Sequence, residues 1–233
     1  MDSIQTLYHG STAIIKKPQF GKGSRSNDYG YGFYCTKDLG LAKEWACGSK
    51  LGGFANVYTI DTAGLAIMCL NEPEYGILDW LAVLVNNREF DITSPIAADA
   101  KEYLTEFFLP DTDAYDAIIG YRADDSYFAF AQDFLNNTIS LRQLNRAMHF
   151  GSLGEQFVLK SQKAFGLIRF VESIPADGEV YHQLRLKRDS EAREQYLRRE
   201  RKAGRGGGDV YLATIIDEEM RHGDERLQEI LRA

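Results

Sequence analysis

The chain has 233 residues, of which 44% are hydrophobic and 12% aromatic, so it can bury a substantial core and is not expected to be disordered over most of its length. Its net charge of −7 gives no global attraction for nucleic acid or an anionic membrane. No apolar run approaches the roughly 18 residues of a membrane helix, and the first residues lack a signal segment. We therefore expect a cytoplasmic protein with no membrane partner, or one delivered into a target cell by a route that needs no signal peptide. Three cysteines without ligand-like spacing predict neither a metal site nor a disulfide framework.

The first strand is predicted over residues 4–10 and ends in a Tyr-His-Gly-Ser motif that contains His9. Residues 11–30 follow as an irregular connection rich in glycine. These glycines have neither the Walker spacing nor a Gly-x-Gly-x-x-Gly fingerprint, so a nucleoside triphosphate site is not expected. Arg25 or Lys22 could reach a pyrophosphate, but a solvated loop charge is the simpler interpretation.

A second strand is predicted around Tyr34, with a helix directly after it. Gly30 and Gly32 alternate with aromatic residues, which permits the backbone to approach a flat ligand closely. Thr36 can cap the helix, and Asp38 lies near its start. The helix is indicated by apolar residues at helical spacing, namely Leu41, Ala42, Trp45 and Ala46. Taken alone, the segment is equally consistent with an ordinary strand-to-helix connection in which Tyr34 fills the core.

The middle of the chain alternates between strand and helix patterns. Strands are predicted at residues 57–61, 65–70 and 115–121, and helices at residues 74–90, 95–109, 128–135 and 137–150. The polar turn before the third of these helices carries Asp124 and Asp125. Acids at a helix N-terminus interact favourably with its dipole, so a capping role is the simpler interpretation and a direct role in an active site is the alternative.

Two further strands are predicted at residues 155–160 and 166–174. The first of them begins with two polar residues, Glu155 and Gln156. Polar side chains at the start of a buried strand need an explanation. Together with the strand that contains His9 and the strand that follows the glycine pair, this makes three strands whose polar positions must be explained.

The character of the sequence changes after about residue 178. Charges alternate in pairs such as Glu194 and Arg198, which favours an exposed helix. Residues 185–205 contain nine basic and four acidic residues. A solvated charged helix is the simpler interpretation of this basic run, and docking on a target is the alternative. A glycine-rich break then precedes a closing helical segment predicted over residues 210–231.

The three polar strands together resemble the ADP-ribosyltransferases of the diphtheria-toxin and poly(ADP-ribose) polymerase type, in which such strands surround NAD. The resemblance implies an α+β fold, the ADP-ribosyltransferase-like split sheet, with two packed, mainly antiparallel sheets and flanking helices. It also implies that residues 1–178 form an NAD-binding domain and that residues 179–233 form a charged, mainly helical C-terminal extension.

The resemblance assigns roles to single residues. His9 matches the histidine that binds the adenosine ribose. Gly10 matches the glycine whose backbone holds the nicotinamide amide, and Ser11 completes the same motif. Tyr34 matches the tyrosine under the nicotinamide ring, and Trp45 matches the second aromatic residue that sandwiches this ring.

Gln156 departs from the pattern, because it stands where the related enzymes carry their catalytic glutamate. An amide can hydrogen-bond a ribose hydroxyl, but it has no charge and cannot act as a general base, so polymer elongation is not expected. Glu155 is adjacent but faces the opposite side of the strand. Asp124 and Asp125 are the other acids that could converge on the site.

A closer resemblance covers most of residues 5–172, to the DUF3990 family of uncharacterised bacterial proteins. The shared motifs are Leu7-Tyr8-His9-Gly10-Ser11, Asp28-Tyr29-Gly30-Tyr31-Gly32-Phe33-Tyr34-Cys35-Thr36, Asn87-Arg88, Tyr115-Asp116-Ala117-Ile118-Ile119-Gly120, Ala123-Asp124-Asp125 and Glu155-Gln156-Phe157. Each motif alone is weak, whereas their combination is specific.

The transferase resemblance implies a bacterial mono-ADP-ribosyltransferase of the toxin or effector type, with NAD as co-substrate and without a metal. Such an enzyme would cleave the nicotinamide–ribose bond and transfer ADP-ribose to a macromolecular acceptor, for which protein is favoured over nucleic acid. An antitoxin or immunity protein would be a further partner. The alternative is a catalytically silent module on the same scaffold, which binds NAD or ADP-ribose or serves only protein interaction.

Overall fold

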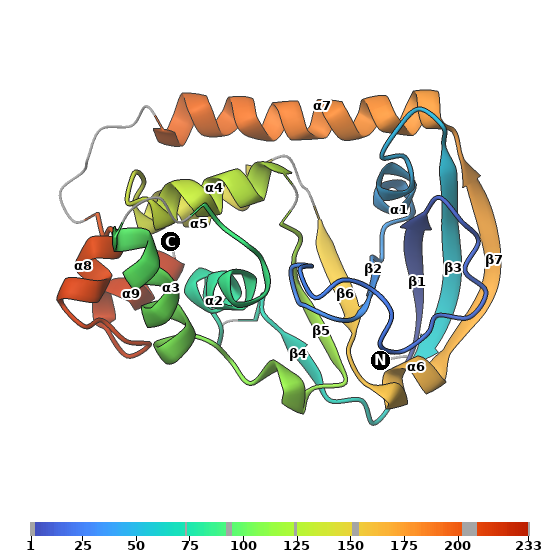
Figure 1. The fold of residues 1–233 in the computed structure, drawn as a ribbon, viewed down its shortest axis with the longest axis horizontal. Coiled ribbons are helices and arrows are strands. Elements are labelled where there is room, and N and C mark those ends of the chain that lie inside the picture. Colours follow the sequence, from blue (N-terminus) through green and yellow to red (C-terminus); the bar gives the residue numbers. More distant parts are fainter. Residues whose placement is uncertain are drawn as a thin grey trace. The chain divides into compact units, whose positions relative to one another are not determined.

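The computed structural model describes most of the chain, namely residues 3–72, 74–91, 95–123, 125–150, 154–201 and 209–232. The chain forms two compact units, which we call the sheet unit and the helical unit. The sheet unit consists of Met1–Cys69, Asp111–Arg122 and Leu153–Arg188, and the helical unit of Leu70–Pro110, Ala123–Ser152 and Asp189–Ala233. The chain is therefore α+β with two mainly antiparallel sheets, which agrees with the fold class that the resemblance implies (Figure 1).

The first sheet of the sheet unit has three antiparallel strands in the order β1-β3-β7. Their bounds are Ile4–Ser11 for β1, Gly53–Asp61 for β3 and Ile168–Ala176 for β7. β1 pairs with β3 along its whole length, which places His9 opposite Asn56. The register of β3 against β7 shifts between Val57 and Tyr58, an irregularity that bends the strand locally.

The second sheet has four strands in the order β2-β6-β5-β4. Their bounds are Phe33–Cys35 for β2, Ile67–Cys69 for β4, Ala117–Tyr121 for β5 and Glu155–Leu159 for β6. Among these described strands, β4 and β5 pair in parallel, and the pairs β2–β6 and β5–β6 are antiparallel. An isolated β-bridge joins the two sheets, in which the N–H groups of Tyr8 and Thr36 donate to each other's carbonyl oxygens at 2.8 and 2.9 Å.

The core of the sheet unit is built from alternate residues of both sheets. Leu7, Tyr58 and Phe157 are each at most 2% exposed and belong to one buried cluster. A short helix that the sequence pattern does not predict, α6 (Gln162–Leu167), adds to this cluster and is capped by Ser161. A short 3₁₀ turn at Thr112–Ala114 precedes β5.

Helix α1 (Leu39–Ala46) follows β2 and packs on β1. Its N-cap is Asp38, whose carboxylate accepts a hydrogen bond from the N–H of Leu41 at 2.9 Å. Thr36 does not cap this helix. Its backbone forms the bridge to β1, and its hydroxyl accepts a hydrogen bond from the N–H of Asp38 at 3.2 Å.

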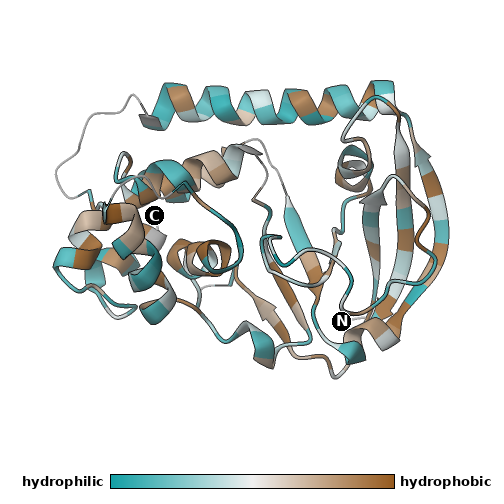
Figure 2. Ribbon diagram, viewed as in Figure 1, coloured by the Kyte–Doolittle hydropathy of each residue, from teal (hydrophilic) through white to brown (hydrophobic). Residues whose placement is uncertain are grey.

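Helix α7 (Gly178–Tyr196) begins where the sequence changes character and is mostly hydrophilic (Figure 2). Its first part belongs to the sheet unit, where the Arg188 guanidinium donates to both carboxylate oxygens of Glu44 on α1 at 2.8 and 3.0 Å. Its later part belongs to the helical unit, and the predicted Glu194–Arg198 ion pair follows at 3.4 Å. The assignment of residues 179–233 to a separate extension stays a prediction.

The helical unit contains α2 (Ile77–Asn87), α3 (Pro95–Phe107), α4 (Asp125–Leu135), α5 (Leu141–Ala147), α8 (Leu212–Asp217) and α9 (Glu225–Arg232). A π-helical turn at Leu197–Arg201 ends α7. Helix α2 is the centre of this unit, because every residue from Ile77 to Val85 is buried, and it is largely hydrophobic in Figure 2. The closing segment, predicted as one helical stretch, is two helices, α8 and α9. Within the described ranges, no helix combines the length and the apolar character needed to cross a membrane.

Candidate functional site

Six of the predicted site residues lie in the sheet unit, on four of its elements: His9, Gly10 and Ser11 on β1, Tyr34 on β2, Trp45 on α1 and Gln156 on β6. Tyr8 uses both its N–H and its C=O to bond Thr36, the residue that directly follows β2. Alternate residues of a strand direct their peptide groups to the same side, so Gly10 directs its N–H and C=O towards β2 and away from β3. The bridge is isolated, and Gly10 is not paired with β2. A planar amide could bind these peptide groups as it would bind a strand edge.

The missing side chain of Gly10 has a separate structural reason. A Cβ atom at this position would lie 2.1 Å from the carbonyl oxygen of Ala42 and 2.8 Å from Cβ of Trp45. Only glycine therefore permits α1 to approach β1 this closely. The same contact holds Trp45 near the backbone of Gly10.

His9 joins β1 to β2 through its side chain. Its Nδ1 lies 2.6 Å from the carbonyl oxygen of Tyr34, and its ring stacks on Phe33 with centroids 4.4 Å apart. A carbonyl oxygen can only accept, so Nδ1 carries a proton. Burial lowers the pKa of His9 and outweighs the hydrogen bond to Tyr34, which raises it. The neutral imidazole therefore has a lone pair on Nε2, which can accept a hydrogen bond from a hydroxyl group.

Tyr34 fixes the glycine turn that precedes β2. Its hydroxyl donates to the carbonyl oxygen of Gly30 at 2.6 Å and accepts from the N–H of Tyr29 at 3.1 Å. Gly30 has a φ of 70°, in the left-handed region that favours glycine. The hydroxyl is thus occupied within the loop, and the half-buried aromatic ring is the part of Tyr34 that could face a ligand.

Trp45 is half-buried on α1. The guanidinium of Arg122 lies over its ring, 4.9 Å from the centroid. The indole Nε1 is buried and has no hydrogen-bond partner among the described residues. An indole N–H that is buried usually finds a partner, so this donor needs an explanation.

Gln156 lies on β6 and is 6% exposed. Tyr34 is opposite Val158, so Gln156, two residues before Val158, lies on the same face of the sheet as Tyr34. Its Oε1 is buried and likewise has no hydrogen-bond partner among the described residues. Gln156 and Trp45 thus provide one unpartnered acceptor and one unpartnered donor.

The acids of the region have different positions. Glu155 is exposed, as expected for the residue that faces the other side of β6 from Gln156. Asp124 lies outside the described residues. Asp125 begins α4 in the helical unit, and its side chain is also outside the described part of the chain. Ser11 uses its hydroxyl in a local turn, where it accepts from the N–H of Ala13 at 3.2 Å.

Asn56 is a residue beside the site that the sequence pattern does not indicate. It is fully buried opposite His9, and its Nδ2 donates to the carbonyl oxygens of His9 at 3.3 Å and Ala13 at 3.1 Å. Its Oδ1 accepts from the N–H of Ile15 at 2.9 Å. Asn56 therefore holds the start of the connection after β1 against the strand that carries His9 and Ser11. The sequence signal for Asn56 is weak, because it consists only of a polar residue at the start of an apolar strand.

Asp116 belongs to a shared motif but has a structural role. Its carboxylate accepts hydrogen bonds from the hydroxyl of Ser161 at 2.6 Å and from the N–H of Ala66 at 3.0 Å, and these bonds lower the pKa of Asp116. They tie the start of β5 to the turns before β4 and α6. The motif around Asp116 therefore needs no ligand to explain it.

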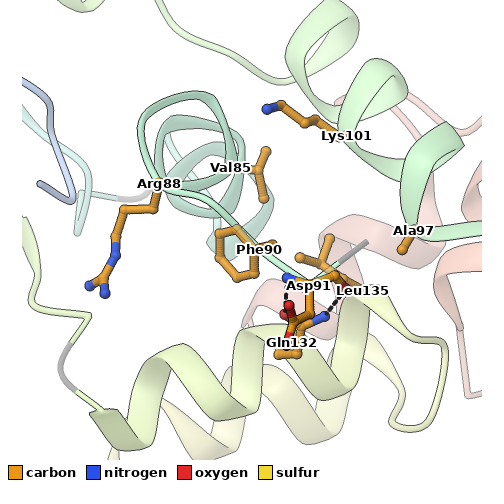
Figure 3. A pocket seen from close by; sticks show the side chains of 8 residues that line it. All are labelled: Val85, Arg88, Phe90, Asp91, Ala97, Lys101, Gln132 and Leu135. Atoms are coloured by element: carbon orange, nitrogen blue, oxygen red, sulfur yellow. Dashed lines mark hydrogen bonds between the residues drawn. The ribbon is translucent and has the colours of Figure 1, made fainter. Parts of the chain in front are cut away.

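The pocket in Figure 3 belongs to the helical unit and contains none of the predicted site residues. Its volume of about 10 Å³ is room for roughly one water molecule. Arg88 directs its guanidinium away from this pocket, to the carbonyl oxygen of Ala123 at 2.8 Å (Figure 3). Asp91 and Gln132 close it with two hydrogen bonds between backbone and side chain. Within the described residues, no group of three or more His, Cys, Asp or Glu side chains could hold a metal ion.

Comparison with known proteins gives one match. None of the curated proteins matches the chain, and none of the solved structures does. A family model described as a protein of unknown function, DUF3990, matches residues 5–170. This range includes every predicted site residue and most of the sheet unit. The chain belongs to the DUF3990 family.

Proposed function

We propose that this chain is a mono-ADP-ribosyltransferase of the bacterial toxin or effector type, built on the split sheet of the ADP-ribosyltransferases. It would use NAD as co-substrate and modify a macromolecular acceptor, with protein favoured over nucleic acid. The observation that carries the proposal is the buried, unpartnered Oε1 of Gln156 on the same face as Tyr34. A buried acceptor without a partner costs stability unless a ligand or water satisfies it, and a ribose hydroxyl is a suitable donor.

The other residues fit a dinucleotide in the same way. The peptide groups of Gly10 are directed away from β3 and could bind the carboxamide of nicotinamide. The neutral His9 offers Nε2 to a ribose hydroxyl. Tyr34 and Trp45 offer aromatic faces for a flat ring, and stacking of this kind favours aromatic ligands.

The reaction would join the acceptor to the anomeric carbon of the nicotinamide ribose. NAD supplies this electrophilic carbon and a leaving group, nicotinamide, which departs with the electron pair of the broken bond. The acceptor would lose a proton to solvent. The chain would bind the dinucleotide in a bent shape that exposes the anomeric carbon, so its contribution is mainly orientation. Gln156 would stabilise the developing positive charge less than a carboxylate does, because its oxygen carries only a partial charge.

A second candidate is supported by the same departure from the pattern. Gln156 is neutral, and the adjacent Glu155 is exposed on the opposite face. A site with this composition could bind NAD or ADP-ribose without transfer. The chain would then be a catalytically silent binding or protein-interaction module.

Labelled NAD tests the proposal. The parent chain, Gln156→Ala and Gln5→Ala would be incubated with NAD labelled in the adenylate part and with bacterial and eukaryotic lysates. Gln5 is a matched control, because it also lies in the sheet unit and its Oε1 is also buried without a described partner. We expect label on macromolecules with the parent and with Gln5→Ala, and little with Gln156→Ala.

Two outcomes would contradict the proposal. NAD binding by calorimetry without any transfer by the parent would support the silent module. If the parent showed neither NAD binding nor transfer, NAD would have no part in the function of this chain.

Asp124→Asn and Asp125→Asn, measured in the same assay, would show whether one of these acids supplies the charge that Gln156 lacks. Loss of transfer in a normally folded variant would assign this role to the substituted acid.

A further inference from the structure

The two aromatic residues assigned to the nicotinamide ring lie on different elements, and a chain of contacts joins them through β5. The hydroxyl of Tyr34 accepts a hydrogen bond from the N–H of Tyr29 at 3.1 Å. The hydroxyl of Tyr29 donates to the carbonyl oxygen of Tyr121, the last residue of β5, at 2.6 Å. The next residue, Arg122, places its guanidinium 4.9 Å from the centroid of the Trp45 ring.

The middle of this chain of contacts is held firmly. Tyr29 is 1% exposed. A Cβ atom at Gly120 would lie 2.3 Å from the hydroxyl oxygen of Tyr29, so the ring of Tyr29 lies directly against β5. β5 itself is paired on both sides, with β4 and β6. Arg122 therefore extends from a strand whose position is fixed by the same tyrosine that contacts Tyr34.

The contact between Arg122 and Trp45 can fix the orientation of the indole ring. A planar guanidinium over an aromatic face is attracted by the ring's electron density, and it restricts rotation of the ring. Trp45 is only half-buried, and its Nε1 makes no hydrogen bond within the described residues. Without the guanidinium, a half-buried ring that makes no hydrogen bond would keep its rotational freedom until a ligand bound. The entropy lost at that moment would weaken binding of the ligand.

We propose that Arg122 is a positioning residue, which holds Trp45 in the orientation that presents one face of its ring to the nicotinamide of NAD. This inference rests on the proposed function. Arg122 acts through Trp45 and needs no contact with NAD. The contacts of Tyr29 with β5 would keep the Trp45 ring and the Tyr34 ring in a constant relation.

The test uses Trp45 as its own reporter. The chain has two tryptophans, so Trp80→Phe leaves Trp45 as the only one. In this background Arg122→Ala should lower the fluorescence anisotropy of Trp45 and weaken NAD binding by calorimetry about threefold. Lys43→Ala is the matched control, because Lys43 lies on the same helix and makes the same kind of contact with Tyr181, at 5.1 Å, and it should change neither value.

A conservative variant separates positioning from general destabilisation. Arg122→Lys keeps a cation near the ring but loses the planar group, so it should restore part of the anisotropy and part of the NAD affinity. Circular dichroism would establish that each variant is folded, and a misfolded Arg122→Ala would leave Arg122→Lys to decide.

Three results would overturn the inference. Unchanged Trp45 anisotropy in a folded Arg122→Ala would mean that Arg122 does not hold the ring. Higher NAD affinity in this variant would mean that the guanidinium occupies the place of the ligand. If the parent bound no NAD, the proposed function would fail and the nicotinamide part of the inference with it, whereas the anisotropy would still decide whether Arg122 orients Trp45.

Discussion

Removal of the Tyr34 hydroxyl tests whether this residue serves the loop, the ligand or both. Tyr34→Phe keeps the ring but removes the hydrogen bonds to the carbonyl oxygen of Gly30, at 2.6 Å, and from the N–H of Tyr29, at 3.1 Å. One such bond contributes ~0.5–1.5 kcal/mol net, so the loss of two should lower the free energy of unfolding by ~1–3 kcal/mol. Gly30 and Tyr29 are buried, which limits replacement by water and favours the upper part of this range.

The assay is urea unfolding of the sheet unit. Fluorescence of Trp45 in a Trp80→Phe background reports on this unit, because Trp80 belongs to the helical unit. Tyr31→Phe is the matched control, since Tyr31 lies in the same turn but is 42% exposed, and it should change the free energy of unfolding by less than ~0.5 kcal/mol. NAD affinity should be nearly unchanged in Tyr34→Phe and clearly weaker in Tyr34→Ala, because only the second variant removes the aromatic face.

Two results would refute this reasoning. A Tyr34→Phe variant as stable as Tyr31→Phe would show that the hydroxyl does not hold the glycine turn. Equal loss of NAD affinity in Tyr34→Phe and Tyr34→Ala would show that the hydroxyl, and not the ring, makes the contact with the ligand.

Gln156→Ala should lower NAD-dependent transfer by a factor of about 10² or more with a smaller change in NAD affinity, because a ribose contact of this kind matters chiefly in the transition state. Gln156→Glu should retain or raise NAD cleavage. Kinetics would measure transfer and cleavage, and calorimetry would measure NAD affinity. Burial lowers the pKa of His9 from its ordinary value of 6.5, so between the two pKa values the unfolded chain binds the extra proton. The free energy of unfolding should therefore fall as the pH decreases below about 6.5, by at most about 1.4 kcal/mol per pH unit, and His9→Gln should flatten this dependence in urea titrations between about pH 7.5 and about pH 5. Gly10→Ala should displace α1 and cost ~3 kcal/mol or more in thermal unfolding, whereas Gly166→Ala, which meets no atom within 4 Å and has an ordinary helical position, should cost almost nothing.

Local sequence patterns predicted most of the elements, because periodicity and turn residues act over short distances. The patterns predict helix α3 at residues 95–109, and this helix ends at Phe107. They predict strand β5 from residue 115, and this strand begins at Ala117. The sequence pattern predicts strand β3 only from residue 57, whereas the strand begins at Gly53. Its early residues include the glycine at position 53 and Asn56, which weaken a strand pattern, and pairing with β1 and β7 overrides this local preference.

The elements that were missed depend on single residues or on tertiary packing. Helix α6 has one and a half turns and contains Gly166, so it gives little periodic signal. The pattern of the closing segment predicts one helical stretch, but Glu219 adopts a φ of 50°, and the chain turns there after the end of α8. Nothing in the residue type of Glu219 indicates a left-handed backbone.

The candidate site was predictable only in part. His9, Tyr34 and Gln156 could be named because each is polar or follows a glycine within an apolar strand. Arg122 could not, because its contact with Trp45 joins residues 77 positions apart in sequence and depends on the tertiary fold of the sheet unit. A role of Asp125 in the site stays a prediction, because its side chain lies outside the described part of the chain.

The ion pair between Arg188 and Glu44 sets a lower limit on the fragment of this protein that could keep the site. Glu44 is 4% exposed and precedes Trp45 on α1. A fragment cut at residue 170, where the family match ends, would also lose most of β7. One cut at residue 178 would keep β7 but leave the Glu44 carboxylate buried without Arg188, on the helix that carries Trp45. The shortest fragment expected to retain the geometry of α1 therefore ends beyond Arg188, within helix α7, which lies after the range matched by the family model.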